Sequence, residues 1–252
     1  MPTIKVVILK CETKFNLKLV SRFWSSRLHI KDMQYVCLFF KWWQQALFPS
    51  KCLVCLTEGE VLCEDHKIKS SLIVIPLKPD NLLDKAFAVS AYEKANVKKI
   101  IGSFKFSRHK AALVPMTEAL VENLNAEDLA GYTLIPLPLH WRREHWRGFN
   151  QATLITKRLA SRLGLKTECK SLIRVKNTQQ QARLTATERA INLKEAFVWK
   201  SKIKPPERVI LVDDVFTTGA TLESATQTLK ENGAKHVIAV VIAYQSLTRK
   251  EG

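Results

Sequence analysis

Residues 209–232 read VILVDDVFTTGATLESATQTLKEN. The run Val209–Val212 is uninterrupted and apolar, as is typical of a strand that is buried on both faces of a parallel sheet. From Leu222 onward the apolar residues recur at helical spacing, and Gly233 stands where a left-handed helix C-cap is expected. The stretch therefore predicts a strand, a loop over residues 213–221 and then a helix.

The loop between this strand and helix has the features of an anion site. A short loop that runs into a helix directs several backbone N–H groups, and the positive end of the helix dipole, at one point. Gly219 lets the backbone approach an anion closely, and the threonines of the loop supply hydroxyl donors. The adjacent carboxylates of Asp213 and Asp214 repel each other unless donors or a cation separate them, as ribose hydroxyls and a magnesium ion would. An ordinary strand–turn–helix with a polar loop is the alternative, and the combination of all nine loop positions favours a phosphate site.

This stretch closely resembles the PRPP-binding motif of type I phosphoribosyltransferases. The resemblance implies that Asp213 and Asp214 meet the ribose 2′- and 3′-hydroxyls of 5-phosphoribosyl-1-diphosphate (PRPP). It also implies that magnesium bridges these hydroxyls and the diphosphate leaving group. The residues that would hold the 5′-phosphate are Val215, Phe216, Thr217, Thr218, Gly219, Ala220 and Thr221.

Length and charge limit the class of protein. A chain of 252 residues can bury one core plus a small accessory module. The formal net charge is +17, and much of the excess lies between residues 141 and 200. This balance favours polyanionic partners such as nucleic acid or diphosphates, with general solubility as the alternative. The chain shows no run of about 20 apolar residues, no signal-peptide pattern and too few cysteines for a disulfide scaffold, so we expect a cytoplasmic protein.

The N-terminal segment differs from the rest. Residues 1–32 are basic and lack turn punctuation, so they are expected to be an extension, with Met33 as a possible true start. Residues 34–48 predict a short helix with an aromatic face. Packing of this helix on the neighbouring module is favoured over a membrane-surface role, because Lys41 is its only basic residue.

Four potential metal ligands follow in paired spacing. Cys52 and Cys55 are separated by two residues, as are Cys63 and His66, and a turn with Gly59 lies between the pairs. This pattern suits tetrahedral Zn²⁺, and a segment so short needs the metal to fold. Because no open coordination position is evident, the metal is expected to be structural. Free thiols and an unrelated histidine on a surface loop are the alternative.

A second basic stretch, residues 136–152, reads PLPLHWRREHWRGFNQA. It predicts a strand, then a proline-stiffened loop, then a helix capped by Asn150. Guanidinium groups of this loop suit phosphate oxygens, and its two tryptophans either stack on a base or anchor the loop. The residues concerned are Arg142, Arg143, Arg147, Trp141 and Trp146. In a phosphoribosyltransferase the loop at this place cradles the diphosphate, but the composition also suits nucleic acid.

Residues 171–199 are polar and rich in Gln, Thr and Arg. A segment of this kind fits either a catalytic hood that closes over PRPP or a plain solvated connection. Arg183 and Arg189 within it are further candidates for nucleic-acid contact.

The order of these features resembles the ComF/GntX family of phosphoribosyltransferase-like proteins, which is associated with competence for DNA uptake. The features are the paired metal ligands, Lys105-Phe106, the 136–152 stretch, the spacing of Gln181, Leu184, Arg189, Asn192, Ala196 and Phe197, and VDDVFTTGAT. The resemblance covers roughly residues 45–245, and His66 departs from it because the family usually has cysteine there. It implies an α/β fold: a type I phosphoribosyltransferase-like, mostly parallel sheet flanked by helices, with a small zinc-finger-like module. We therefore expect an extension and aromatic helix over 1–48, the module over 49–78 and the main domain over 79–252.

Two functions are compatible with the sequence. The first is an enzyme that transfers phosphoribose from PRPP and Mg²⁺ to an unknown acceptor, with Asp213, Asp214 and Arg147 as catalytic residues. The second is a non-catalytic single-stranded-DNA-binding competence factor in which the PRPP site serves regulation or stability. Other DNA-uptake proteins are possible partners of either.

Overall fold

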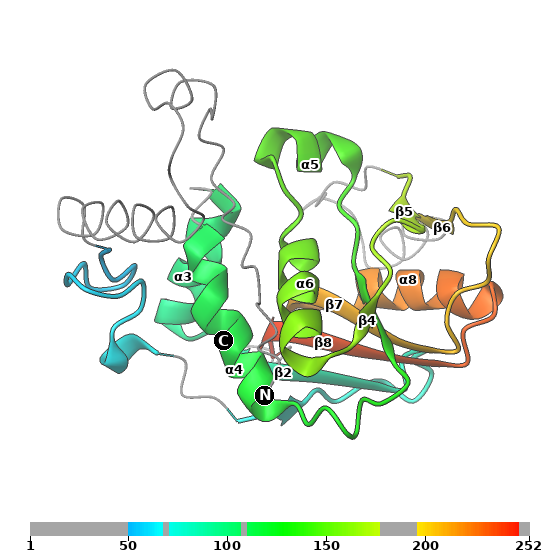
Figure 1. Ribbon diagram of the computed structural model, residues 1–252, viewed down its shortest axis with the longest axis horizontal. Helices are drawn as coiled ribbons and strands as arrows, with labels where there is room; N and C mark the ends of the chain where they lie inside the picture. Colours follow the sequence, from blue (N-terminus) through cyan, green and yellow to red (C-terminus); the bar gives the residue numbers. More distant parts are fainter. Residues whose placement is uncertain (1–49, 68–70, 107–109, 177–195, 247–252) are drawn as a thin grey trace, which may run out of the picture. The chain divides into compact units, whose positions relative to one another are not determined.

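The computed structural model describes residues 50–67, 71–106, 110–176 and 196–246 (Figure 1). The chain divides into two compact units, Met1–Pro49 and Ser50–Gly252, and every element described below belongs to the second. The predicted extension and aromatic helix lie outside the described residues, as do Arg183 and Arg189. Within the described ranges, no helix is long and apolar enough to cross a membrane.

A six-stranded sheet forms the centre of the second unit, in the order β1-β2-β8-β7-β3-β4. The edge strand β1 is antiparallel to β2, and every other pairing is parallel. The strands are β1 (Ile73–Val74), β2 (Lys85–Ala91), β3 (Thr133–Pro136), β4 (Lys166–Thr167), β7 (Arg208–Phe216) and β8 (His236–Tyr244). Because the central strands β7 and β8 are apolar runs covered on both faces, they are almost wholly buried, as predicted for the former.

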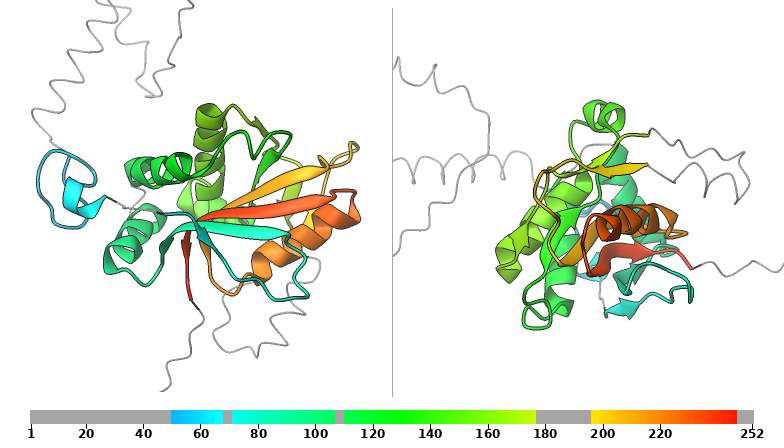
Figure 2. Two further views of the ribbon diagram at one scale, coloured as in Figure 1. Left: turned by 90° about the horizontal axis from the view of Figure 1, so that it is seen from below. Right: turned by 90° about the vertical axis from the view of Figure 1, so that its right-hand side faces the viewer.

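Helices cover both faces of the sheet (Figure 2). One face packs against α3 (Ala95–Phe106), α4 (Leu113–Asn123) and α6 (Gln151–Leu163), with Ile210 and Val212 of β7 in that core. The other face packs against α8 (Ala220–Glu231) and a hairpin, with Val209 and Leu211 in that core. The hairpin consists of β5 (Leu172–Arg174) and β6 (Phe197–Trp199). The short elements are η1 (Glu64–His66), η2 (Lys110–Ala112) and α5 (Trp141–Arg147).

The topology has a switch point between the carboxyl ends of β3 and β7, and this place is called the crevice below. The connection that leaves β3 leads to β4, whereas the connection that leaves β7 leads through α8 to β8, on the opposite side. In open α/β sheets, ligands bind where neighbouring strands send the chain in opposite directions. The two strands are in register here, since Pro136 pairs with Val212 and the Leu137 N–H donates to the Val212 carbonyl at 2.9 Å.

Two local predictions were wrong. Strand β7 continues through Asp213 and Asp214 to Phe216, because β8 continues beside it and pairs Tyr244 with Phe216. The acids therefore lie on the strand, and the turn is confined to residues 217–219.

The predicted proline-stiffened loop is in part the helix α5. His140 caps it by accepting from the Arg142 N–H at 3.4 Å, and Gly148 ends it at φ 80°. The capping role predicted for Asn150 is confirmed, because its side chain accepts from the Ala152 N–H at 3.0 Å.

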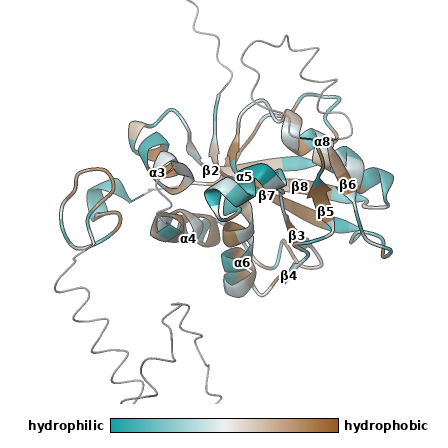
Figure 3. Ribbon diagram, turned by 90° about the horizontal axis from the view of Figure 1, so that it is seen from above, coloured by the Kyte–Doolittle hydropathy of each residue, from teal (hydrophilic) through white to brown (hydrophobic). Residues whose placement is uncertain are grey.

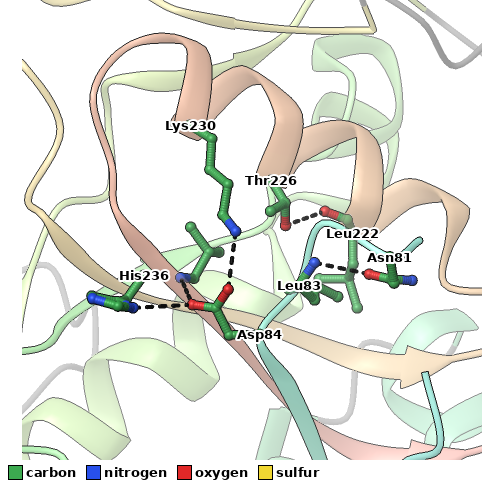
Figure 4. A network of polar contacts seen from close by, with 8 residues as sticks. Asn81, Leu83, Asp84, Leu222, Thr226, Lys230 and His236 are labelled. Atoms are coloured by element: carbon green, nitrogen blue, oxygen red, sulfur yellow. Dashed lines mark hydrogen bonds and ion pairs between the residues drawn. The ribbon is translucent and has the colours of Figure 1, made fainter. Parts of the chain in front are cut away.

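A polar network joins several elements at the end of the sheet where β2 and β8 begin, which is opposite the crevice (Figure 4). The carboxylate of Asp84 accepts from Lys230 Nζ at 2.9 Å and from the Val237 N–H at 2.9 Å. His236 Nδ1 lies 3.5 Å from the same carboxylate. This one side chain therefore ties the start of β2 to the end of α8 and the start of β8.

Candidate functional site

The turn after β7 has the form of a phosphate-binding loop. Gly219 is the N-cap of α8 and has φ 78°, a conformation that disfavours any residue with a Cβ. A Cβ at this position would lie 2.5 Å from Cζ of Phe216, whose ring is buried against Tyr244. Thr217 and Thr218 are exposed beside the first N–H groups of the helix, which have no acceptor within the helix. The turn therefore offers backbone and hydroxyl donors to an anion.

The two acids lie at the carboxyl end of the same strand but in different surroundings. Asp213 is half-buried, whereas Asp214 is only 4% exposed. Asp213 Oδ1 accepts from the Asp214 N–H at 2.8 Å, so the first side chain is held by the backbone of the second. A buried carboxylate requires compensation by cations or donors.

Arg147 provides part of that compensation. It ends α5 and donates through Nη1 to Gln151 Oε1 at 2.7 Å, while its Nε atom is buried without a hydrogen-bond partner. Burial lowers the pKa of Arg147, Asp214 and Asp213 raise it, and Arg143 lowers it. The predicted arginine and the predicted acids are thus brought together, and a donor of Arg147 remains available for a ligand.

His140 and Arg174 also belong to this group of charged and polar side chains, and the sequence analysis did not single them out. His140 is only 6% exposed, and its pKa is lowered by burial and by the charges of Arg142, Arg174 and Arg143. It is therefore neutral at pH 7, in agreement with its role as acceptor for the Arg142 N–H. Arg174 comes from the hairpin. The sequence did not single it out, because it is one arginine among many in a basic segment.

The tryptophans of α5 are exposed to solvent. Trp141 is 64% and Trp146 63% exposed, the guanidinium of Arg142 lies 5.3 Å from the Trp141 ring, and the His140 ring lies 5.7 Å from it. Figure 3 shows α5 as a polar helix beside the ends of the central strands. Aromatic and cationic groups displayed together in this way suit stacking on a base as well as contact with phosphates.

The four predicted metal ligands converge. Their ligand atoms all lie within 4.8 Å of one another. Cys55 Sγ and Cys63 Sγ are 3.7 Å apart, and His66 Nδ1 lies 3.8 Å from Cys52 Sγ and 3.0 Å from Cys63 Sγ. A tetrahedral zinc site with ordinary bond lengths separates its sulfurs by about 3.8 Å and sulfur from nitrogen by about 3.6 Å. The cluster fits zinc, and His66 presents Nδ1 to it.

The thiol of Cys52 has a lowered pKa, which favours binding of a cation. Its burial raises the pKa, but hydrogen bonds from the backbone of Cys55, Cys63 and Val54 and from the Cys55 side chain outweigh that effect and lower the pKa to about 6. A thiolate is the form that binds metal.

The segment that carries the four potential metal ligands is joined to the main domain by packing. Cys52 and Leu62 are buried in the same core as Ile100 and Phe104 of α3. Lys99 of α3 also donates to the Val54 carbonyl at 2.8 Å. The module is therefore packed on α3, and β1, which lies inside the range predicted for the module, is a strand of the main sheet.

Comparison with known proteins agrees with this description. The model of the phosphoribosyl transferase domain family matches residues 150–251. Competence protein F of Haemophilus influenzae is 40% identical over 107 residues, which are 41% of this chain and 46% of that protein. Competence protein ComFC of Bacillus subtilis is 27% identical over 233 residues, which are 91% of this chain and 90% of that protein.

DNA utilization protein YhgH of Salmonella typhi is 36% identical over 144 residues, or 55% of this chain. That match spans 63% of the length of the Salmonella protein, less than two thirds. The mostly parallel sheet and the domain match over residues 150–251 indicate a phosphoribosyltransferase-like fold. Within these ranges, the chain is similar to two competence proteins and to a DNA utilization protein.

Proposed function

We propose that this protein binds PRPP with Mg²⁺ in the crevice between β3 and β7 and transfers its phosphoribosyl group to an acceptor during DNA uptake. One observation supports the proposal: the α8 N-terminus, the two acids and the α5 arginines lie at the same end of the sheet, where β3 and β7 end. The role in DNA uptake is taken from the relatives, two of which are named as competence proteins and one as a DNA utilization protein.

The residues would divide the work as follows. The turn at Gly219 would hold the 5′-phosphate, and Asp213 and Asp214 would orient the ribose hydroxyls. Arg147 and Arg143 would stabilise the negative charge that develops on the departing diphosphate. Mg²⁺, held beside Asp213 and Asp214, would supply additional neutralisation of that charge.

Binding of PRPP is the first test. Calorimetry with PRPP and Mg²⁺ should give a clear signal with the parent protein and a loss of about tenfold or more with Asp213→Asn, because the substitution removes the charge of the hydrogen-bond acceptor. Asp80→Asn, at an exposed position, is the control and should bind like the parent. A parent protein that fails to bind PRPP rejects the proposal. Release of diphosphate in the presence of candidate acceptors then tests transfer.

A second function is favoured by the exposed tryptophans of α5 and by the net charge of +17. The protein would then bind single-stranded DNA, with bases stacked on Trp141 and Trp146. In fluorescence anisotropy, affinity should fall steeply with salt, and each Trp→Ala change should cost about 1–3 kcal/mol. Val114→Ala, which removes an exposed apolar side chain of α4, is the control. Weak binding that is insensitive to both salt and the tryptophans refutes this function.

We further propose that Cys52, Cys55, Cys63 and His66 hold a structural zinc ion. The fit of their spacing to a tetrahedral site supports this assignment. Metal analysis should find about one zinc per chain, and a metal-free parent protein would reject it.

A further inference from the structure

The sulfurs of the four potential metal ligands differ in how far solvent reaches them. Cys52 is wholly buried, Cys63 is partly buried and Cys55 is exposed. Sγ of Cys55 lies 3.7 Å from Sγ of Cys63 and 3.1 Å from the hydroxyl oxygen of Thr57. The exposed sulfur therefore has a second cysteine sulfur close to it. A structural zinc ion needs four ligands but does not require that one of them be open to solvent.

Backbone hydrogen bonds hold the two cysteines in this arrangement. The Leu53 N–H donates to the Val61 carbonyl at 3.0 Å. The Gly59 N–H donates to the Ser50 carbonyl at 2.8 Å. Both bonds tie the segment of the first ligand pair to the turn or to the segment that follows it. The two sulfurs are therefore brought together by the backbone of the loop as well as by a shared metal.

An exposed cysteine with a neighbouring cysteine is the arrangement that peroxides oxidise to a disulfide. A metal-binding cysteine is a thiolate, and the thiolate is also the nucleophile that attacks a peroxide. Susceptibility to oxidation follows thiolate character and exposure, and the resulting sulfenic acid condenses with a nearby thiol. Exposure therefore makes Cys55 the first sulfur to react, and Cys63 the one that resolves it. Burial shields Cys52 from the oxidant.

We infer that Cys55 and Cys63 form a peroxide-sensitive pair whose oxidation to a disulfide removes two of the four metal ligands. First, the Cys55 sulfur attacks hydrogen peroxide, so that an S–O bond forms and the O–O bond breaks. The Cys63 sulfur then attacks the Cys55 sulfur, so that an S–S bond forms and the S–O bond breaks. Each step releases a hydroxide that takes up a proton to become water, and the two electrons that the cysteines lose reduce the peroxide. This inference rests on the zinc assignment proposed above.

The loss of two ligands acts on the main domain through the buried cysteine. Cys52 and His66 supply only two of the four ligands of a tetrahedral zinc site, so the metal leaves. Cys52 and Leu62 are buried in the same core as Ile100 and Phe104 of α3. The loop that packs on α3 thereby loses the contribution of the metal to its folding. Oxidation at the surface of the loop therefore lowers the stability of the core.

The test treats the whole chain, loaded with zinc, with hydrogen peroxide. A metal indicator follows zinc release, and peptide mass spectrometry identifies the cysteines that pair. The parent should release about one zinc per chain as the disulfide between Cys55 and Cys63 forms. A dithiol reductant should restore both the thiols and zinc binding.

Two variants make the test specific. Cys55→His keeps four ligands, two cysteines and two histidines, but lacks the exposed sulfur, so it should release zinc at least about tenfold more slowly than the parent. Cys169→Ser is the control, because it removes a partly buried cysteine outside the cluster, and it should release zinc at the rate of the parent.

Each outcome decides a different point. A parent protein that contains no zinc rejects the zinc assignment, and the disulfide map alone then decides whether the pair is peroxide-sensitive. Three results overturn the inference: zinc that stays bound after peroxide, a disulfide that includes Cys52, or release from Cys55→His as fast as from the parent. If Cys55→His does not hold zinc, the disulfide map of the parent decides, and any pairing other than Cys55 with Cys63 overturns the inference.

Discussion

Replacing Gly219 with alanine tests the phosphate-binding turn directly. At φ 78°, an L-residue costs about 1–2 kcal/mol relative to glycine. The new Cβ would also lie 2.5 Å from Phe216 Cζ, and the Phe216 side chain is buried. Overpacking of this kind costs a further 1–3 kcal/mol, roughly. We therefore expect Gly219→Ala to lower the free energy of unfolding by about 2–5 kcal/mol.

Gly164 provides a matched control. It has φ 68° at the C-cap of α6, and a Cβ there would meet no atom within 4 Å. Gly164→Ala should therefore show the conformational cost alone, about 1–2 kcal/mol. The assay is urea denaturation of both variants and the parent, followed by calorimetry with PRPP and Mg²⁺.

The binding measurement adds a second expectation. Because the Cβ must displace either the Phe216 ring or the turn, PRPP affinity should fall at least about tenfold in Gly219→Ala and remain unchanged in Gly164→Ala. Equal destabilisation by the two substitutions would refute the crowding described between Gly219 and Phe216. A destabilised Gly219→Ala protein that binds PRPP normally would refute the role of the turn.

Three further expectations concern other parts of the chain. Asp84→Asn should lower the free energy of unfolding by about 1–3 kcal/mol in denaturant titration, against little change for the exposed Asp80→Asn, because two donors lose their charged acceptor. The lowered pKa of His140 means that the unfolded state binds more protons, so stability should rise with pH toward about 6.5 and level off above it. His140→Asn, which can still cap α5, should flatten that rise, and an unchanged pH profile would contradict the assignment. Cys52→Ser should lose zinc in metal analysis while Cys169→Ser retains it, and equal zinc content in both would count against the site.

Much of the site could be predicted because its residues are contiguous in sequence. An apolar strand, two acids, a glycine and a helical pattern appear in order within one stretch, and local geometry forces them together. The paired spacing of the metal ligands is equally local, and the four atoms do converge as that spacing predicted.

The rest depended on tertiary pairing. The end of β7 was placed too early because the acids Asp213 and Asp214 suggested a loop, whereas pairing with β8 carries the strand on to Phe216. The helix α5 was read as a loop because Pro136 and Pro138 precede it, although neither proline lies within the helix. Arg174 was not singled out, because its pairing with Phe197 joins residues that are distant in sequence.

The burial of Cys52 and Leu62 against α3 has a consequence for how this protein melts. A finger attached by a linker would come apart by itself and leave the sheet intact. Here the loop that carries the four ligands and the sheet share one hydrophobic core. Removal of the metal by a chelator should therefore shift the temperature of a single cooperative unfolding transition, which calorimetry detects for the whole unit. The stability of the folded phosphoribosyltransferase-like domain itself would then depend on the bound metal.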